Sequence, residues 1–138
     1  MRKALQQYQT VNLESDIESA SPYRITQMLL EGCIRFLKQA RFAIEKNDFE
    51  KKSHFIAKSE AIVATLASSV DKDVSPELSD NLVLLYDFAI QRMIDASVEM
   101  SVDKLDDAIE VISEIKQGWD SIPRDEIAKA EVMRAGKK

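Results

Sequence analysis

Apolar residues recur every three or four positions over four long stretches of the chain, which is the spacing of a helix with one buried side. The stretches cover residues 21–47, 49–70, 75–100 and 101–122. Helices of roughly 20–26 residues would be about 30–39 Å long at 1.5 Å per residue, so the four match in length. Because short connections make consecutive helices antiparallel, the pattern predicts an all-α, up-down-up-down four-helix bundle over residues 21–122.

Helix-start signals stand at the beginning of each stretch. Ser21-Pro22 and Ser75-Pro76 each offer a capping hydroxyl followed by proline at the first helical position. Asp48 is placed to cap the second helix, and either Ser101 or Asp103 the fourth. Pro123 then breaks or restarts the chain.

The third stretch carries more apolar residues than one buried side requires. Its stripe contains Leu78, Leu82, Leu85, Tyr86, Ala89, Met93, Ala96 and Met100, and Val83, Ile90 and Ile94 widen it. Leu84 and Phe88, four positions apart, fall outside the stripe. They either face a partner or, if the stripe is centred nearer Leu85, belong to the core. Surplus apolar surface of this kind needs a second element or a partner to cover it.

The second predicted helix has a less regular set of apolar positions. Apolar positions of residues 49–70 are Phe49, Phe55, Ile56, Ile62, Val63, Leu66 and Val70.

Residues 1–20 form an arm with no long stripe, although Leu5 and Tyr8 would share one small apolar face. The arm is either disordered or docked on the bundle. Residues 123–138 form a tail that is either a short helix or disordered.

Charge and composition limit the classes of partner and compartment. The net charge of −5 argues against nucleic-acid binding, which normally uses a basic patch. Between Asp95 and Asp120 the sequence has eight acidic residues and two basic ones, a composition that is typical of a solvated helix side. No apolar run approaches the ~18 residues of a membrane helix. The single Cys33 suits a reducing compartment, so we expect a soluble, cytoplasmic protein.

Candidate catalytic chemistry is sparse. A di-iron bundle needs two Glu-x-x-His pairs, but His54 is the only histidine and Lys51 stands three residues before it. Cys33 lies in the apolar stripe of the first helix, as a buried structural thiol would. The three glycines are isolated, so no phosphate loop is present. We therefore expect no enzyme activity, cofactor or metal, and interpret the chain as a binding protein.

Three further side chains have open roles. Trp119 extends the stripe of the fourth helix and is expected to pack in the core rather than contact a partner. Tyr23 is either a packing residue or a hydroxyl anchor. Asp87 interrupts the apolar run, so its carboxylate either reaches solvent or pairs with Arg92 or Arg41.

Several short motifs occur together in a fixed order. They are Tyr8-Gln-Thr-Val-Asn-Leu-Glu-Ser, Ala20-Ser-Pro-Tyr-Arg-Ile, Met28-Leu-Leu-Glu-Gly, Asn81-Leu-Val-Leu-Leu-Tyr-Asp-Phe and Gly118-Trp119. In this order and spacing, over about residues 5–122, the chain resembles the flagellar export chaperone family (FliS). The resemblance implies a four-helix bundle that binds the disordered C-terminal region of flagellin in the cytoplasm, prevents premature polymerisation and aids secretion.

The resemblance also suggests where such a partner would bind. The client would lie in apolar grooves, and the arm would cap part of this surface when the client is absent. We expect a binding groove formed by Leu84, Asp87, Phe88, Val83, Ile62 and Leu66, and an autoinhibitory cap formed by Leu5, Tyr8 and Val11. The flagellar export apparatus is a second candidate partner, and we expect a monomer or weak homodimer. The alternative is a structural module that self-associates through the apolar surface of the third helix.

Overall fold

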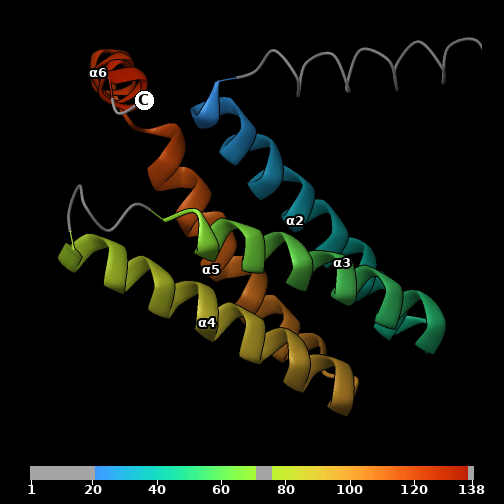
Figure 1. Ribbon diagram of the computed structural model, residues 1–138. Coiled ribbons are helices and arrows are strands. Elements are labelled where there is room, and N and C mark those ends of the chain that lie inside the picture. The colour runs from blue at the N-terminus through green and yellow to red at the C-terminus, as the bar shows by residue number, and fades with distance from the viewer. Residues whose placement is uncertain (1–20, 71–75, 137–138) are drawn as a thin grey trace, which may run out of the picture.

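The computed structural model describes residues 21–70 and 76–136, which form five helices and no strand. These are α2 (Pro22–Glu45), α3 (Phe49–Ser68), α4 (Pro76–Glu99), α5 (Val102–Asp120) and α6 (Arg124–Gly136). Figure 1 shows α2 to α5 as a bundle in which each helix runs opposite to the one before it. The predicted all-α, up-down-up-down bundle is therefore confirmed. The proposed arm, with its cap residues Leu5, Tyr8 and Val11, lies outside the described residues.

Side-chain caps fix three of the helix starts. The Ser21 hydroxyl accepts a hydrogen bond from the Arg24 amide at 3.2 Å, with Pro22 in the first turn. Asp48 accepts from the Lys51 amide at 3.1 Å. Ser101, rather than Asp103, caps α5 by accepting from the amide of Lys104 at 3.2 Å. Each cap satisfies an amide that has no partner inside its helix.

The two short turns each contain one residue in the left-handed backbone region. Asn47 has φ 55° and Met100 has φ 53°. Asparagine enters this region more easily than most residues, but an unbranched methionine does so at some cost. These residues reverse the chain just after α2 and α4, so both helices end one or two residues before the predicted positions.

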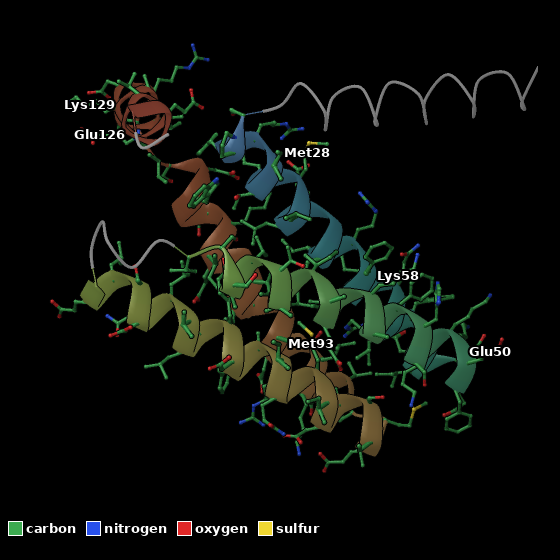
Figure 2. All side chains as sticks on the ribbon, in the orientation of Figure 1. Met28, Glu50, Lys58, Met93, Glu126 and Lys129 are labelled. Carbon is green, nitrogen blue, oxygen red and sulfur yellow. The ribbon has the colours of Figure 1, made fainter. Side chains whose placement is uncertain are left out.

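The core lies between the four helices, each of which packs against two neighbours: α2 against α3 and α5, and α4 against α3 and α5. Its fully buried side chains come from all four helices, and Met93 can be seen inside the bundle in Figure 2. Members of the core cluster are Leu30, Cys33, Leu37, Ala40, Ile44, Ile56, Val63, Leu66, Tyr86, Ala89, Met93, Ala96, Leu105, Ala108 and Ile112.

Four residues assigned to buried stripes are in fact exposed: Leu78, Leu85, Ile94 and Phe49. The buried positions of α4 include Tyr86, Ala89, Met93 and Ala96, and Leu78 and Leu85 lie at the edge of that strip. A helix with two neighbours buries only part of its circumference, so residues at the edge of a wide apolar stripe stay in solvent. Phe49 lies at the first position of α3, where the bundle ends.

Polar contacts tie neighbouring helices together at the edges of the core. Arg41 donates from Nε to Asp106 of α5 at 2.8 Å. Lys52, although buried, donates from Nζ to the Ser97 carbonyl of α4 at 3.0 Å. This bond satisfies an ammonium group that would be costly to bury alone. The side chain of Lys52 therefore serves as a cross-link between α3 and α4.

A reciprocal contact joins the first and last helices of the bundle. The Tyr23 hydroxyl donates to the Trp119 carbonyl at 3.0 Å, and the Trp119 indole donates to the Tyr23 carbonyl at 3.1 Å. Their rings stack with centroids 5.4 Å apart and an interplanar angle of 15°. Trp119 also packs against the core cluster. Tyr23 is thus a hydroxyl anchor as well as a packing residue, and Trp119 is a packing residue.

The substitution Tyr23→Phe is expected to lower the free energy of unfolding by about 1 kcal/mol, because the stack survives but the Trp119 carbonyl loses the hydroxyl donor and keeps the Ile122 amide at 3.2 Å. Urea denaturation followed by the fluorescence of this single tryptophan measures the loss. Gln27→Ala is the control for the other hydrogen bond of this hydroxyl, which accepts from the Gln27 amide at 3.2 Å. A Tyr23→Phe variant as stable as the parent chain would show that the hydroxyl contributes nothing.

The tail after Pro123 forms α6, which Figure 1 shows nearly end-on beyond the last turn of α5. Ile122 and Ile127 line a small crevice between α6 and the start of α2, next to Tyr23 and Trp119. Within residues 21–70 and 76–136, no helix has the length and apolar content that crossing a membrane requires.

Candidate functional site

The surplus apolar residues of α4 face outward. Leu84 and Phe88 are 65% and 42% exposed, on the side of the helix away from the buried Tyr86 and Met93. Leu78 and Leu85 are also exposed on α4, and these four side chains are here called the α4 patch. The question that the sequence left open is thereby settled in favour of an outward-facing pair. An apolar patch on a well-packed helix is a candidate interaction surface.

Charged residues border the α4 patch. The Arg92 guanidinium lies 5.2 Å from the centre of the Phe88 ring and 3.8 Å from the Asp107 carboxylate of α5. Arg41 of α2 is paired with Glu45 of the same helix and with Asp106 of α5. Both candidate partners of Asp87 are therefore engaged elsewhere, and the Asp87 carboxylate is exposed to solvent.

The remaining predicted groove residues are not part of this patch. Leu66 is buried in the core cluster, so it offers no surface and we exclude it from the candidate site. Ile62 is half-buried, and its Cδ1 lies 3.8 Å from where a β-carbon on Gly32 would stand. It therefore belongs to the seam between α2 and α3. Val83 is half-buried on α4. The structure brings together only Leu84, Asp87 and Phe88 as exposed neighbours.

Groups that could do chemistry are separated or buried. Cys33 is fully buried, and burial raises the pKa of its thiol to about 12, so the reactive thiolate is suppressed. His54 is exposed and contacts the edge of the Phe55 ring, with centroids 5.2 Å apart. Among the described residues no three His, Cys, Asp or Glu side chains gather as a metal site would need. The surface is suited to binding rather than to catalysis.

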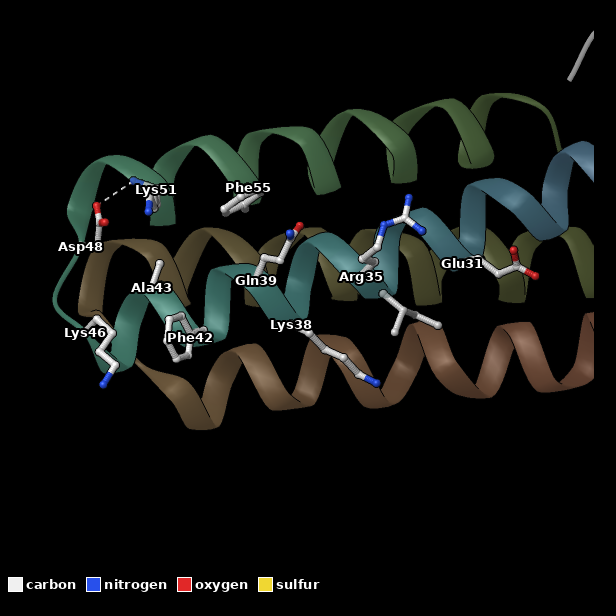
Figure 3. Close-up of a pocket in the computed structure, with 11 residues that line it drawn as sticks. Glu31, Arg35, Lys38, Gln39, Phe42, Ala43, Lys46, Asp48, Lys51 and Phe55 are labelled. Atoms are coloured by element: carbon white, nitrogen blue, oxygen red, sulfur yellow. Dashed lines mark hydrogen bonds between the residues drawn. The ribbon is translucent and has the colours of Figure 1, made fainter. Parts of the chain in front are cut away.

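A second surface, which the sequence analysis did not identify, runs along the outer side of α2 and the adjoining side of α3. It is an open groove of about 800 Å³, here called the α2–α3 groove. Figure 3 shows Phe42 and Phe55 beside it, with Arg35 and Lys38 along α2 and Lys51 on α3. Its lining residues are Glu31, Ile34, Arg35, Lys38, Gln39, Phe42, Ala43, Lys46, Asp48, Lys51 and Phe55.

One signal in the sequence could have indicated this side of the bundle. Lys38 and Lys58 have no acidic residue three or four positions away in either direction, so no intrahelical ion pair is available to them. In a chain with a net charge of −5, lysines without such partners on two adjacent helices are a sign of a locally basic side.

The comparison with protein families decides the identity of the chain. The model of the flagellar protein FliS matches residues 4–126, which is most of the chain. The chain belongs to the FliS family. The flagellar secretion chaperone FliSB of Pseudomonas aeruginosa is 35% identical over 120 residues, covering 87% of this FliS chain and 95% of that protein. FliS of Vibrio cholerae is 36% identical over 123 residues, covering 89% and 90%.

The fold of this FliS protein has also been seen by crystallography. A crystal structure of a bacterial flagellar chaperone matches with a TM-score of 0.67 and 22% identity, covering 86% of this chain and 94% of that one. At that identity the likeness establishes the fold alone. The relatives are secretion chaperones, so the FliS family is one of chaperones and not of enzymes.

Proposed function

We propose that this FliS chain binds the disordered C-terminal region of flagellin in the cytoplasm, prevents its premature polymerisation and aids its secretion, with the α4 patch as a binding surface. The observation that carries the proposal is the exposure of Leu84 and Phe88 on a rigid helix of a flagellar secretion chaperone. A client segment that folds on binding gains from burying such side chains, and the amphipathic helix-in-groove mode needs them.

Energetics favour an extended client interface over a small one. Ordering a disordered segment costs about 2–5 kcal/mol of the gross interaction energy. Burying one large apolar side chain returns only about 1.5–3 kcal/mol. The two exposed side chains Leu84 and Phe88 are therefore anchors within a longer contact surface.

Phe88→Asp is expected to weaken binding of a flagellin C-terminal peptide by about tenfold or more, because it places a carboxylate in the apolar contact. Calorimetric titration of the full chain with that peptide measures the change. Val132→Asp on α6 is the control, since it also places a carboxylate at an exposed apolar position. We expect the control to bind within about twofold of the parent chain.

The same titration can overturn the proposal. No binding of the peptide to the parent chain at micromolar concentration would contradict flagellin as the client. Equal weakening by Phe88→Asp and Val132→Asp would contradict the α4 patch as the surface. Light scattering over a dilution series tests the alternative of self-association. A dimer that persists on dilution and dissociates in Phe88→Asp would favour a homodimer through α4.

A further inference from the structure

The cations of the bundle divide into two groups. Four line the α2–α3 groove, namely Arg35, Lys38, Lys46 and Lys51, and Lys58 lies beside it over the Phe36 ring. None of these five forms an ion pair with a residue that the structure describes. The other described cations of α2–α5 are engaged. Arg24, Arg41, Arg92, Lys104 and Lys116 form ion pairs, and Lys52 donates to the Ser97 carbonyl. Uncompensated positive charge is thus concentrated on the α2–α3 side.

Two acidic residues line the α2–α3 groove against four basic ones, so they offset only part of this charge. Glu31 accepts from Arg24 at 3.3 Å, and Asp48 is occupied by the Lys51 amide as the cap of α3. The groove therefore presents net positive charge on a protein that is acidic as a whole. A surface of this kind attracts anionic partners and orients them on approach.

Aromatic rings form the apolar part of the same side. Phe42 is 61% exposed, and Phe36 stacks on Phe55 with ring centroids 6.1 Å apart. Arg35 and Lys58 lie 5.7 and 5.2 Å from the centre of the Phe36 ring. Lys46 lies 5.4 Å from the centre of the Phe42 ring. These cations lie over the rings, and four of the five phenylalanines of the chain are on α2 or α3.

We propose that the α2–α3 groove is a second docking surface, which takes an acidic amphipathic helix of a partner protein. Apolar side chains of that helix would cover Phe42 and Phe55, and carboxylates on its flanks would meet Arg35, Lys38 and Lys51. From Glu31 to Lys46 the groove follows α2 for about 22 Å at 1.5 Å per residue. That length accommodates a helix of about four turns.

The shape of the surface favours a helix over a membrane. A lipid surface needs a flat or convex basic patch, whereas here the cations and phenylalanines line a hollow of about 800 Å³. The proposal goes beyond the flagellin-binding function and does not depend on it, because the α4 patch and the α2–α3 groove share no residue.

The test uses the full chain and a designed, end-blocked acidic peptide of about 16 residues, with leucines on one helical side and glutamates on the others. Its controls are the same peptide with lysine in place of glutamate and a scrambled acidic peptide. Fluorescence anisotropy of the labelled peptides measures binding. We expect the acidic amphipathic peptide to bind about tenfold or more tightly than either control, and to weaken as NaCl is raised from about 50 to 500 mM.

Variants locate the binding on the chain. The pair Arg35→Glu with Lys38→Glu should weaken the acidic peptide by about tenfold or more. The pair Arg124→Glu with Lys129→Glu on α6 makes the same change in net charge and should leave binding within about twofold. Phe88→Asp on the α4 patch should also leave it unchanged, which separates this surface from the proposed flagellin surface. Circular dichroism verifies that each variant remains helical.

Several outcomes would overturn the proposal. Equal affinity for the acidic, basic and scrambled peptides would show that charge does not select the partner. Equal affinity of the two charge-reversed variants for the acidic peptide would show that the α2–α3 groove does not bind it. Binding of the chain to vesicles of anionic lipid, lost in Arg35→Glu with Lys38→Glu while the peptide does not bind, would assign the surface to membranes. Light scattering that shows a dimer dissociated by the same pair would assign it to a second copy of the chain.

Discussion

Replacing Leu105 by alanine is expected to lower the free energy of unfolding by about 3 kcal/mol, because a fully buried leucine leaves both lost apolar contact and a cavity. Leu105 lies in the core cluster, where α5 packs against α2 and α4. Alanine and leucine have similar helix propensities, so the loss measures packing rather than helix formation. Urea denaturation, followed by circular dichroism and by the fluorescence of Trp119, gives the value.

Leu84→Ala is the matched control for this experiment. It makes the same chemical change in the middle of a helix, but at a side chain that is 65% exposed. We expect the free energy of unfolding to change by no more than about 0.5 kcal/mol. Equal losses in the two variants would show that Leu84 is packed in the folded protein, and would remove it from the α4 patch as well.

The helix boundaries were accessible to sequence reasoning because they are set by local interactions. Ser21, Asp48 and Ser101 each bond to an amide three residues later in the chain, so the signal and its partner lie in one short segment. The burial of Cys33 was similarly predictable, since this residue lies in the apolar stripe of the first helix.

The outer side of α4 could not be derived from the sequence. Leu78 and Leu84 are chemically identical, and the apolar pattern placed one in the buried stripe and the other outside it, yet both are exposed. Which positions of a wide apolar helix are buried depends on the direction from which α3 and α5 approach it. That direction is set by tertiary packing, and the helical periodicity of the sequence does not reveal it.

The basic groove escaped prediction for a related reason. Glu31 stands four residues before Arg35, a spacing that favours an intrahelical ion pair. In the folded chain Glu31 instead contacts Arg24, seven residues before it, and Arg35 lies over the Phe36 ring. Ion-pair choice among exposed side chains rests on small energy differences. That Arg35 has no ion pair therefore becomes visible only when the contacts are known.

The two surfaces differ in the chemistry that they offer. The α4 patch is mainly apolar, with Asp87 and Arg92 at its border, whereas the α2–α3 groove combines phenylalanines with basic side chains. Because they share no residue, a contact confined to one surface leaves the other accessible. A rigid bundle of this kind could hold a flagellin segment and a second, acidic partner at the same time.

Alkaline pH is expected to destabilise the fold, chiefly through one buried thiol. Burial raises the pKa of Cys33 to about 12, whereas an unfolded cysteine titrates near 8.5. Burial, and then the neighbouring Cys33 thiol, also raise the pKa of Tyr86 to about 12, against about 10 when unfolded. Both groups therefore stay protonated in the folded chain at pH values where the unfolded chain has released their protons.

The sign of the effect follows from this proton balance. Below about pH 8 both states keep these protons, so this contribution to stability is fully present, and it is lost as the pH rises toward 12. At pH 10.5 the loss of stability caused by Cys33 alone is about 2–3 kcal/mol, since one pKa unit corresponds to about 1.4 kcal/mol. Urea denaturation at pH 8 and 10.5 measures the total loss, which also includes the lysines. In Cys33→Ala, which has no thiol to titrate, the loss between these pH values should be smaller by that amount. An identical loss in both chains would mean that the Cys33 thiol ionises in the folded protein as readily as in the unfolded one, and that the core around it admits water.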